Sequence, residues 1–304
     1  MARRFTLYWS NFKSYDECPR KFLWYRGWQG IDLGNGPGKS KTKPETFSKH
    51  DAVMGIVIQK AIEIMYNNEL WKTPATLRDS LEKLTKRHFE FELGKNYIDW
   101  KKSPAKLDLY ETCLEGVFGY LSTLKQYRLV GSYAKSEKDL FAYITDEVSV
   151  GGRADLIVKR GDTGVTIIDG KNSKQKSKYL DPDQLRWYGL CFYLCYNQLP
   201  DRLGWVYYRY PYGMETAEGV EPGVEWIDFS LEDLKGLANR AVKVRQSMDK
   251  HIFHADPSPN TCRFCEYQSI CPEREAQKEK NRRPPKDLKP LPEKNSEGFG
   301  FDEF

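Results

Sequence analysis

The chain has 304 residues, of which 39% are hydrophobic, so it is long enough for one large domain or two smaller ones with a substantial core. Its 48 Lys and Arg exceed its 43 Asp and Glu by five, which permits a polyanionic partner without requiring one. No apolar run reaches membrane-spanning length, and the first residues lack the apolar segment of a secretory signal, so we expect a cytoplasmic protein.

The N-terminal part of the sequence predicts a helical opening followed by a loop. Residues 5–28 are rich in aromatic side chains and predict helix, with Ser14 as a helix cap. Residues 34–44, GNGPGKSKTKP, predict a loop because of their glycines and prolines. The loop imitates a phosphate-binding motif, but Leu33 stands where that motif needs its first glycine, and no strand precedes it. Nucleotide hydrolysis is therefore a poor interpretation of this segment.

A helical region is predicted over about 48–130. Its first helix repeats apolar residues at intervals of three and four, which predicts one buried face made of Val53, Val57, Ala61 and Ile64. Residues 76–93 and 105–129 continue the helical pattern, with Pro74 and Pro104 as breaks between the segments.

The pattern then changes to short β-branched runs separated by turn residues. Three strands in a meander are predicted over 136–144, 148–159 and 164–172. A helix is predicted over 181–198, with Asp181 as its cap and a proline in its first turn.

The remaining sequence predicts two further strands over 203–210 and 223–229, then a helix over 230–250 capped by Ser230. This order favours a mixed α/β core, over about 135–230, with a helical subdomain. Residues 1–273 are expected to form one domain. Residues 274–304 are rich in proline and charge and poor in aliphatic residues, so we expect a disordered tail.

Two carboxylates on adjacent predicted strands indicate a metal site. Asp155 and Asp169 are 14 residues apart, and two antiparallel strands joined by a tight turn can bring them to one end of a sheet. Two hard oxygen ligands with open positions suit Mg²⁺ or Mn²⁺. Lys171 lies two residues after Asp169, hence on the same face of its strand, where it can orient or activate an attacking water.

The following helix and its preceding loop add polar and basic residues near this site. Gln184 and Tyr188 are four apart and share one helix face, which could brace Lys171 or touch a nucleic-acid backbone. The side chains predicted to contact DNA phosphates are Lys174, Lys176, Lys178 and Arg186.

Seven cysteines in a chain without an export signal favour metal ligation or burial over disulfides. Three of them, Cys113, Cys191 and Cys195, lie among apolar residues and are predicted to be buried. The other four are Cys18 and the C-x₂-C-x₅-C run of Cys262, Cys265 and Cys271. Four thiols suit a closed metal site, for which zinc and an iron–sulfur cluster are both open, and His251 or His254 could also serve zinc.

Together these motifs resemble the PD-(D/E)xK nucleases of the RecB type, in particular the iron–sulfur branch with CRISPR-associated and AddB-type nucleases. GRAD at 152–155 is similar to the family's G-x-x-D strand, IIDGK at 167–171 to its (D/E)-x-K strand, and QLRWY at 184–188 to its Q-x₃-Y helix. The likeness spans roughly residues 8–272. It implies a restriction-endonuclease-like core, with a mixed central sheet flanked by helices, in a bacterial or phage-infected cell.

The resemblance implies a metal-dependent DNA nuclease, acting as an exonuclease on single strands or ends in recombination, repair or phage DNA metabolism. Asp155 and Asp169 would hold Mg²⁺ or Mn²⁺ with the Gly170 carbonyl, and Glu137 matches a glutamate on the preceding strand. Gln59 stands where the family often has a metal-binding histidine in G-x-x-x-H. Because of this departure, an alternative function stays open, namely that of a DNA-binding accessory protein that does not cleave DNA.

The resemblance also implies that Cys18, in CPRKF, joins Cys262, Cys265 and Cys271 in holding a [4Fe–4S] cluster. Such a cluster would act as a staple between the two ends of the domain, with folding coupled to metal binding. Beyond it, the acidic-aromatic tip SEGFGFDEF, 296–304, suggests either an unstructured end or a docking segment for a replication or recombination protein.

Overall fold

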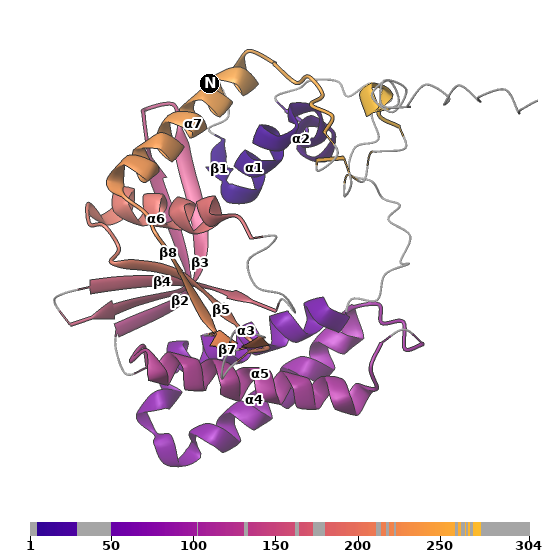
Figure 1. Ribbon diagram of the computed structural model, residues 1–304, viewed down its shortest axis with the longest axis vertical. Coiled ribbons are helices and arrows are strands. Elements are labelled where there is room, and N and C mark those ends of the chain that lie inside the picture. The colour runs from indigo at the N-terminus through magenta and orange to yellow at the C-terminus, as the bar shows by residue number, and fades with distance from the viewer. Residues whose placement is uncertain are drawn as a thin grey trace, which may run out of the picture.

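A computed structural model of the chain shows a central sheet with helices on both sides (Figure 1). The structure describes residues 5–28, 50–101, 103–130, 133–161, 164–172, 180–210, 214–216, 219–221, 223–258, 261–262, 265, 267 and 270–274. Among the described helices, none is both long and apolar enough to cross a membrane.

The helices are α1 (Trp9–Glu17), α2 (Pro19–Arg26), α3 (His50–Asn67), η1 (Leu70–Lys72), α4 (Pro74–Lys95), α5 (Lys106–Gln126), α6 (Pro182–Tyr196) and α7 (Leu231–Asp249). The strands are β1 (Thr6–Tyr8), β2 (Tyr133–Tyr143), β3 (Ser149–Arg160), β4 (Gly164–Lys171), β5 (Arg202–Tyr207), β6 (Met214–Thr216), β7 (Gly219–Glu221) and β8 (Val224–Ile227). The predicted mixed α/β architecture is confirmed.

Six strands form one mixed sheet in the order β1-β3-β4-β5-β8, with β2 paired along β3. The β2, β3 and β4 strands form an antiparallel meander, whereas β4 and β5 are parallel because α6 crosses between them. The β6 and β7 strands pair only with each other.

Helices cover both faces of the sheet, and Figure 1 shows α6 and α7 on one side and α3, α4 and α5 on the other. Strand β4 is buried on both faces, so adjacent residues enter different cores. Ile167 belongs to the same buried cluster as Trp187 of α6 and Leu234 of α7, while Ile168 belongs to the cluster of Ile58 of α3 on the opposite face. This alternation explains why apolar side chains of the strand point to both faces of the sheet.

The two ends of the described chain lie against each other. The amide of Arg20 donates to the His254 carbonyl at 3.1 Å, and its guanidinium pairs with Glu273 at 2.6 Å. The rings of Trp24 and Tyr267 meet edge to face at 5.4 Å. Helix α2 is therefore packed beside the segment that carries the C-terminal cysteines.

The structure confirms some of the predicted helix caps and element boundaries and contradicts others. Two helix caps are confirmed, since Asp181 accepts from Asp183 and Ser230 forms a reciprocal capping box with Asp233. The predicted cap at Ser14 is wrong, because α1 begins at Trp9 and contains Ser14. The helical opening also begins with a strand, β1, which pairs in parallel with the start of β3.

Burial on the first long helix follows the predicted spacing with one exception. Val53, Val57 and Ala61 of α3 are buried, but Ile64 is only half-buried. Met65, four residues after Ala61, is buried in its place. The predicted loop over 34–44 and nearly all of the 274–304 tail lie outside the described residues.

Candidate active site

Asp155 and Asp169 face each other where strands β3 and β4 part. The two strands pair from Arg160 and Gly164 to Leu156 and Ile168, and the next step in this register sets Asp155 opposite Asp169. The same edge of β3 pairs with β1 only over 149–151. Between these two partners, the described pairing leaves the edge of 152–155 open. The carboxylates therefore lie at an opening in the sheet, as their positions on adjacent strands predicted.

The Asp155 side chain is fixed by the backbone of the opposite strand. Its Oδ2 accepts a hydrogen bond from the Gly170 amide at 2.8 Å. Its carbonyl oxygen accepts from Ser136 Oγ at 2.8 Å and from Gln59 Nε2 at 3.5 Å. These bonds hold the Asp155 backbone and one carboxylate oxygen in place.

Asp169 is a buried carboxylate, with a side chain only 5% exposed. Its Oδ2 forms an ion pair with the Lys171 ammonium but accepts no well-formed hydrogen bond from any described residue. Burial raises the pKa of Asp169, and Lys171 partly offsets that rise. A buried carboxylate beside a second carboxylate is the donor set that suits a hard divalent cation. The residues present therefore fit Mg²⁺ or Mn²⁺.

Lys171, Gln184 and Tyr188 form one hydrogen-bond network with Asp169. Lys171 Nζ donates to Gln184 Oε1 at 3.2 Å, and Gln184 Nε2 donates to Asp169 Oδ1 at 3.4 Å and to the Tyr188 hydroxyl at 3.2 Å. Of the two predicted roles for this face of α6, the structure supports bracing of Lys171. Burial raises the pKa of Tyr188, so its hydroxyl stays neutral and can accept the Gln184 bond.

Gln59 reaches the same site from α3. Its Oε1 accepts a hydrogen bond from the Tyr208 hydroxyl, and its Nε2 faces the Asp155 carbonyl. The Gln59 oxygen, the only metal-ligating atom of this side chain, is thus engaged with Tyr208. Tyr208 also lies over Gly170, where an added Cβ would sit 1.7 Å from its hydroxyl oxygen. Tyr208 could not be predicted from the sequence, because nothing marks a tyrosine after a strand as different from its neighbours.

A second group of hydrogen bonds and an ion pair connect α3 with the end of β4. Arg209 Nε donates to Asn172 Oδ1 at 3.1 Å, and its terminal nitrogen pairs with Asp51. Asn172 also donates to the Asp51 carbonyl. These residues were not predicted, since their pairing depends on segments 158 positions apart.

Several predicted site residues are not brought to the carboxylates or cannot be placed. Glu137 lies on β2, but its side chain is outside the described residues, as are the lysines Lys174, Lys176 and Lys178. Arg186 bonds to Asp183 at 3.0 Å and to the Asp228 carbonyl at 3.0 Å. Its guanidinium is thus engaged within the protein, and its contact with DNA stays a prediction.

The four predicted cluster cysteines line one pocket at the junction of the chain ends. This pocket is lined by Cys18, Cys262, Cys265 and Cys271, with basic residues Arg20, Lys21 and Arg274 beside them. Burial raises the pKa of the Cys265 and Cys271 thiols, so metal binding there must release protons. Neither His251 nor His254 is among the described residues that line it.

The remaining cysteines behave largely as predicted. Cys113 and Cys191 are fully buried, whereas Cys195 is half-buried and its thiol faces the Phe141 carbonyl at 3.2 Å. Within the part of the chain that the structure describes, no three His, Cys, Asp or Glu side chains are already arranged as a metal-binding group.

Comparison with known proteins decides the family. The model of the PD-(D/E)XK nuclease superfamily matches residues 9–272, most of the chain. The chain belongs to this superfamily. No curated protein matches it. A solved structure titled "Crystal structure of SSO0001" is 14% identical, with 77% of this chain and 88% of that chain covered and a TM-score of 0.34.

Membership of the PD-(D/E)XK superfamily gives the site its chemical context. Members are typically nucleases that use Mg²⁺ or Mn²⁺, and a nuclease implies a nucleic-acid substrate such as DNA. The match includes the strands and helix that bring Asp155, Asp169, Lys171 and Gln184 together, as well as the segments with Cys18 and Cys271.

Proposed function

We propose that this protein is a divalent-metal-dependent deoxyribonuclease that acts as an exonuclease on single-stranded DNA or DNA ends. One observation carries the proposal: Asp155 and Asp169 meet at the opening between β3 and β4, with Lys171 held beside them by Gln184. Two carboxylates and a lysine at an opening in the pairing of a sheet can serve phosphodiester hydrolysis and have no evident use in packing.

Asp155 and Asp169 would hold Mg²⁺ or Mn²⁺, with the Gly170 carbonyl as a further ligand. When bound, the cation supplies Lewis-acid chemistry and neutralises charge on the phosphate. In the reaction, a water oxygen bonds to phosphorus, the bond from phosphorus to the leaving sugar oxygen breaks, and the water proton passes to that oxygen. Lys171 provides positive charge at the phosphate and orients the water. Gln184 keeps the ammonium of Lys171 at this position.

The four cysteines support a second part of the proposal, that the chain belongs to the RecB-like iron–sulfur branch. A shared pocket for Cys18 and the three C-terminal cysteines places soft ligands from both chain ends together. Basic side chains around the pocket lower the cost of thiolate charge. We assign these residues to a [4Fe–4S] cluster, with zinc as the alternative metal, in a nuclease domain of residues 1–273.

A second candidate function is DNA binding without cleavage. It is favoured by Gln59, which replaces the family's frequent histidine and whose oxygen is engaged by Tyr208. A site with only two carboxylate ligands binds its cation more weakly than one with an added imidazole.

Degradation of end-labelled single-stranded DNA separates these functions. Protein purified without oxygen is tested with Mg²⁺ or Mn²⁺, beside Lys171→Ala and the control Lys243→Ala, an exposed position on α7. We expect Lys171→Ala to cleave at least about 100-fold more slowly and the control to match the unmodified protein. Resistance of circular single strands would identify the activity as exonucleolytic. DNA binding without cleavage by the unmodified protein would establish the accessory function instead.

A further inference from the structure

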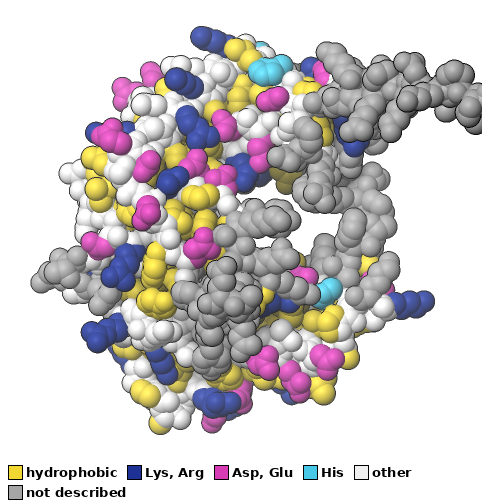
Figure 2. All heavy atoms as spheres, in the orientation of Figure 1, with side chains coloured by type: hydrophobic (Ala, Val, Ile, Leu, Met, Phe, Trp, Pro, Cys, Tyr) yellow, Lys and Arg dark blue, Asp and Glu magenta, His cyan; other side chains and the backbone are white. Residues whose placement is uncertain are grey.

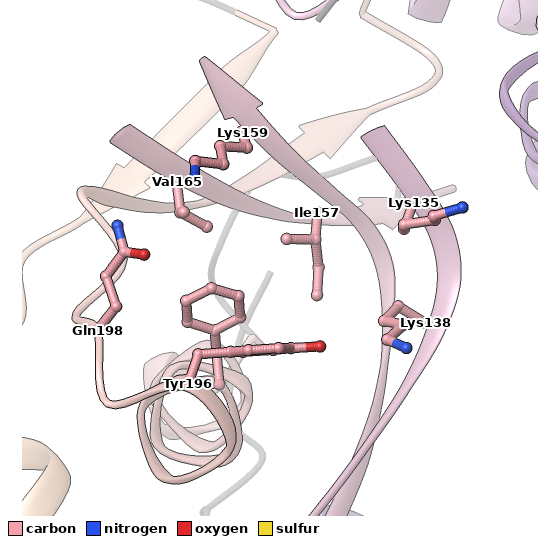
Figure 3. A pocket seen from close by; sticks show the side chains of 8 residues that line it. Lys135, Lys138, Ile157, Lys159, Val165, Tyr196 and Gln198 are labelled. Atoms are coloured by element: carbon pink, nitrogen blue, oxygen red, sulfur yellow. The ribbon is translucent and has the colours of Figure 1, made fainter. Parts of the chain in front are cut away.

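A pocket on the α6 side of the sheet lies at the far end of β4 from the candidate active site. Its volume is about 360 Å³, within the range of small-ligand sites. Figure 3 shows Ile157 at its centre, Tyr196 across the bottom, and Gln198 on the side opposite Lys138. The lining residues are Lys135, Lys138, Ile157, Lys159, Val165, Phe192, Tyr196 and Gln198.

The lining combines an apolar base with a basic rim. Ile157, Val165 and Phe192 are almost completely buried, while Tyr196 is 51% exposed and stands 4.7 Å from the Phe192 ring, centroid to centroid. An exposed aromatic ring next to an apolar surface is a platform on which a planar group can stack.

The charged side chains that line the pocket are all basic. Three of its eight lining residues are lysines, and none of the eight is acidic. Lys138 and Lys159 are exposed, and no ion pair joins either of them to another described residue. On the face shown in Figure 2, by contrast, acidic and basic side chains are interspersed. The lining of the pocket therefore differs from that surface in presenting lysine ammonium groups beside an aromatic ring, with the carboxylates of Asp139 and Asp201 outside the lining.

The position of the pocket connects it to the reaction. Gln184, Tyr188, Phe192 and Tyr196 follow one another at intervals of four along α6, so the helix that braces Lys171 also supplies the aromatic wall. Val165 precedes Asp169 by four residues on β4, a separation of about 13 Å between their Cα atoms. Lys138 pairs with Ala154, the residue before Asp155. Among the residues that line the pocket, Lys138 is therefore the nearest in register to Asp155.

We propose that this pocket binds a segment of single-stranded nucleic acid outside the active site, with an unstacked base against Tyr196 and phosphates on Lys138 and Lys159. This inference rests on the proposed function and names its substrate class. A single strand is favoured because a base buried within a duplex cannot enter a pocket of this kind.

The test measures binding alone, in the presence of a chelator, so that it does not depend on cleavage. Fluorescence anisotropy is recorded with labelled oligothymidylates of about 6 and about 20 nucleotides over a range of salt concentrations. The variants are Lys138→Glu with Lys159→Glu, Tyr196→Ala and Tyr196→Phe. Lys243→Glu, at an exposed position of α7, is the control for a change of charge.

We expect the unmodified protein to bind the longer strand more tightly than the shorter one. The double lysine variant should lose about tenfold in affinity for the longer strand, and its slope of log affinity against log salt should fall by about 0.7 for each lost phosphate contact. Tyr196→Ala should lose affinity without a change of slope, because stacking releases no counterions, and Tyr196→Phe should keep it.

Two results would overturn the inference while leaving the nuclease proposal intact. In the first, the double lysine variant binds no worse than Lys243→Glu, or Tyr196→Ala behaves like Tyr196→Phe. In the second, a labelled peptide of sequence SEGFGFDEF binds the pocket more tightly than either oligonucleotide, which would make it a peptide-docking site. The nuclease proposal would fail on a different result. In that case the unmodified protein would not cleave DNA in the presence of metal, independently of the binding curves.

Discussion

The Lys171 ammonium is 3.2 Å from Gln184 Oε1, so a lysine at the end of a strand is held by the first turn of the helix that follows. Because Gln184 also donates to Asp169, it fixes the lysine relative to the carboxylate. We predict that Gln184→Ala lowers the rate of DNA cleavage by about 10- to 100-fold, since small displacements of a positioned group are costly. Single-turnover rates with saturating metal measure this loss.

The matched control for Gln184→Ala is Tyr188→Phe. This change keeps the ring that packs against Gly152 and removes only a hydroxyl that accepts from Gln184. We expect a loss of only a few fold from Tyr188→Phe, and melting temperatures close to that of the unmodified protein for both variants. Full activity in Gln184→Ala would show that Lys171 needs no brace.

Position 170 needs a glycine because the side chain of Tyr208 lies over it. A Cβ at this position would be 1.7 Å from the Tyr208 hydroxyl oxygen and 2.3 Å from its ring carbon Cζ. We predict that Gly170→Ala displaces Tyr208, breaks its bond to Gln59 and destabilises the fold by about 1–3 kcal/mol. Urea unfolding followed by tryptophan fluorescence measures the free-energy change.

Gly236 on α7 provides the opposite case, because nothing lies within 4 Å of an added Cβ there. Gly236→Ala should stabilise the protein by about 0.5–1 kcal/mol, as expected for alanine in a helix interior. If the two substitutions change stability by the same amount, Tyr208 is not what constrains position 170.

The identity of residue 59 provides a test of the metal site that does not rely on cleavage. Gln59 lies on α3 with its Nε2 3.5 Å from the Asp155 carbonyl, so an imidazole at this position would lie beside the residue that supplies one of the two carboxylates. We predict that Gln59→His tightens Mn²⁺ binding by about tenfold, because a neutral imidazole is a common metal ligand and would add to the two carboxylates. Calorimetric titration of Mn²⁺ into both proteins measures the difference.

A companion variant, Gln59→Leu, removes the acceptor for Tyr208 without adding a ligand. It should bind Mn²⁺ no more tightly than the unmodified protein. Weaker binding in Gln59→His than in Gln59→Leu would contradict a role for this position beside the metal.

The cap of α7 gives a pH dependence of known sign. Asp233 accepts from the Ser230 hydroxyl and amide, and these two bonds, the hydroxyl first, hold the pKa of Asp233 below its ordinary value. A carboxyl with a lowered folded-state pKa stabilises the fold above its ordinary pKa, and that contribution disappears as pH falls through the lowered value. Asp233→Asn should therefore melt at a lower temperature at neutral pH.

The difference between Asp233→Asn and the unmodified protein should shrink as the pH falls below about 4. Melting temperatures measured across this range test the sign. Glu232→Gln, at an adjacent residue that pairs with Lys235 instead of the helix cap, should show no comparable convergence. A gap that widens in acid would contradict the capping argument.

The sequence predicted the core of the site because its residues lie close together in the chain. Asp155, Asp169, Lys171 and Gln184 span only 30 positions, and strand pairing plus side-chain alternation suffices to bring them together. The strand β1 escaped prediction because three residues beside an aromatic helix carry too little periodicity to be recognised.

Contacts between distant segments could not be predicted from the sequence, for a different reason. Tyr208 meets Gln59 across 149 positions, and Arg209 meets Asp51 across 158, so each depends on how the helices sit on the sheet. Neither side chain carries a local pattern that names its partner. Gln59 was singled out only through a family resemblance, and its engagement by Tyr208 became visible only in three dimensions.

The last prediction concerns the cysteines at the junction of the two chain ends. If Cys18, Cys262, Cys265 and Cys271 hold a [4Fe–4S] cluster, protein purified without oxygen should contain about four iron ions and four sulfides per chain. Cys18→Ser should lose most of this iron, because a cluster with three protein thiolates is held less tightly. Cys195→Ser, a half-buried cysteine outside the pocket, should retain it.

Loss of the cluster should also loosen the junction, since metal bonds would close a loop of some 240 residues there. Hydrogen exchange over 252–274 should therefore rise in Cys18→Ser, while exchange in α7 stays low. Zinc in place of iron would keep the staple and exclude the cluster. Unmodified protein that is free of both metals would contradict a metal staple, and the junction would then depend on contacts such as Arg20 with Glu273.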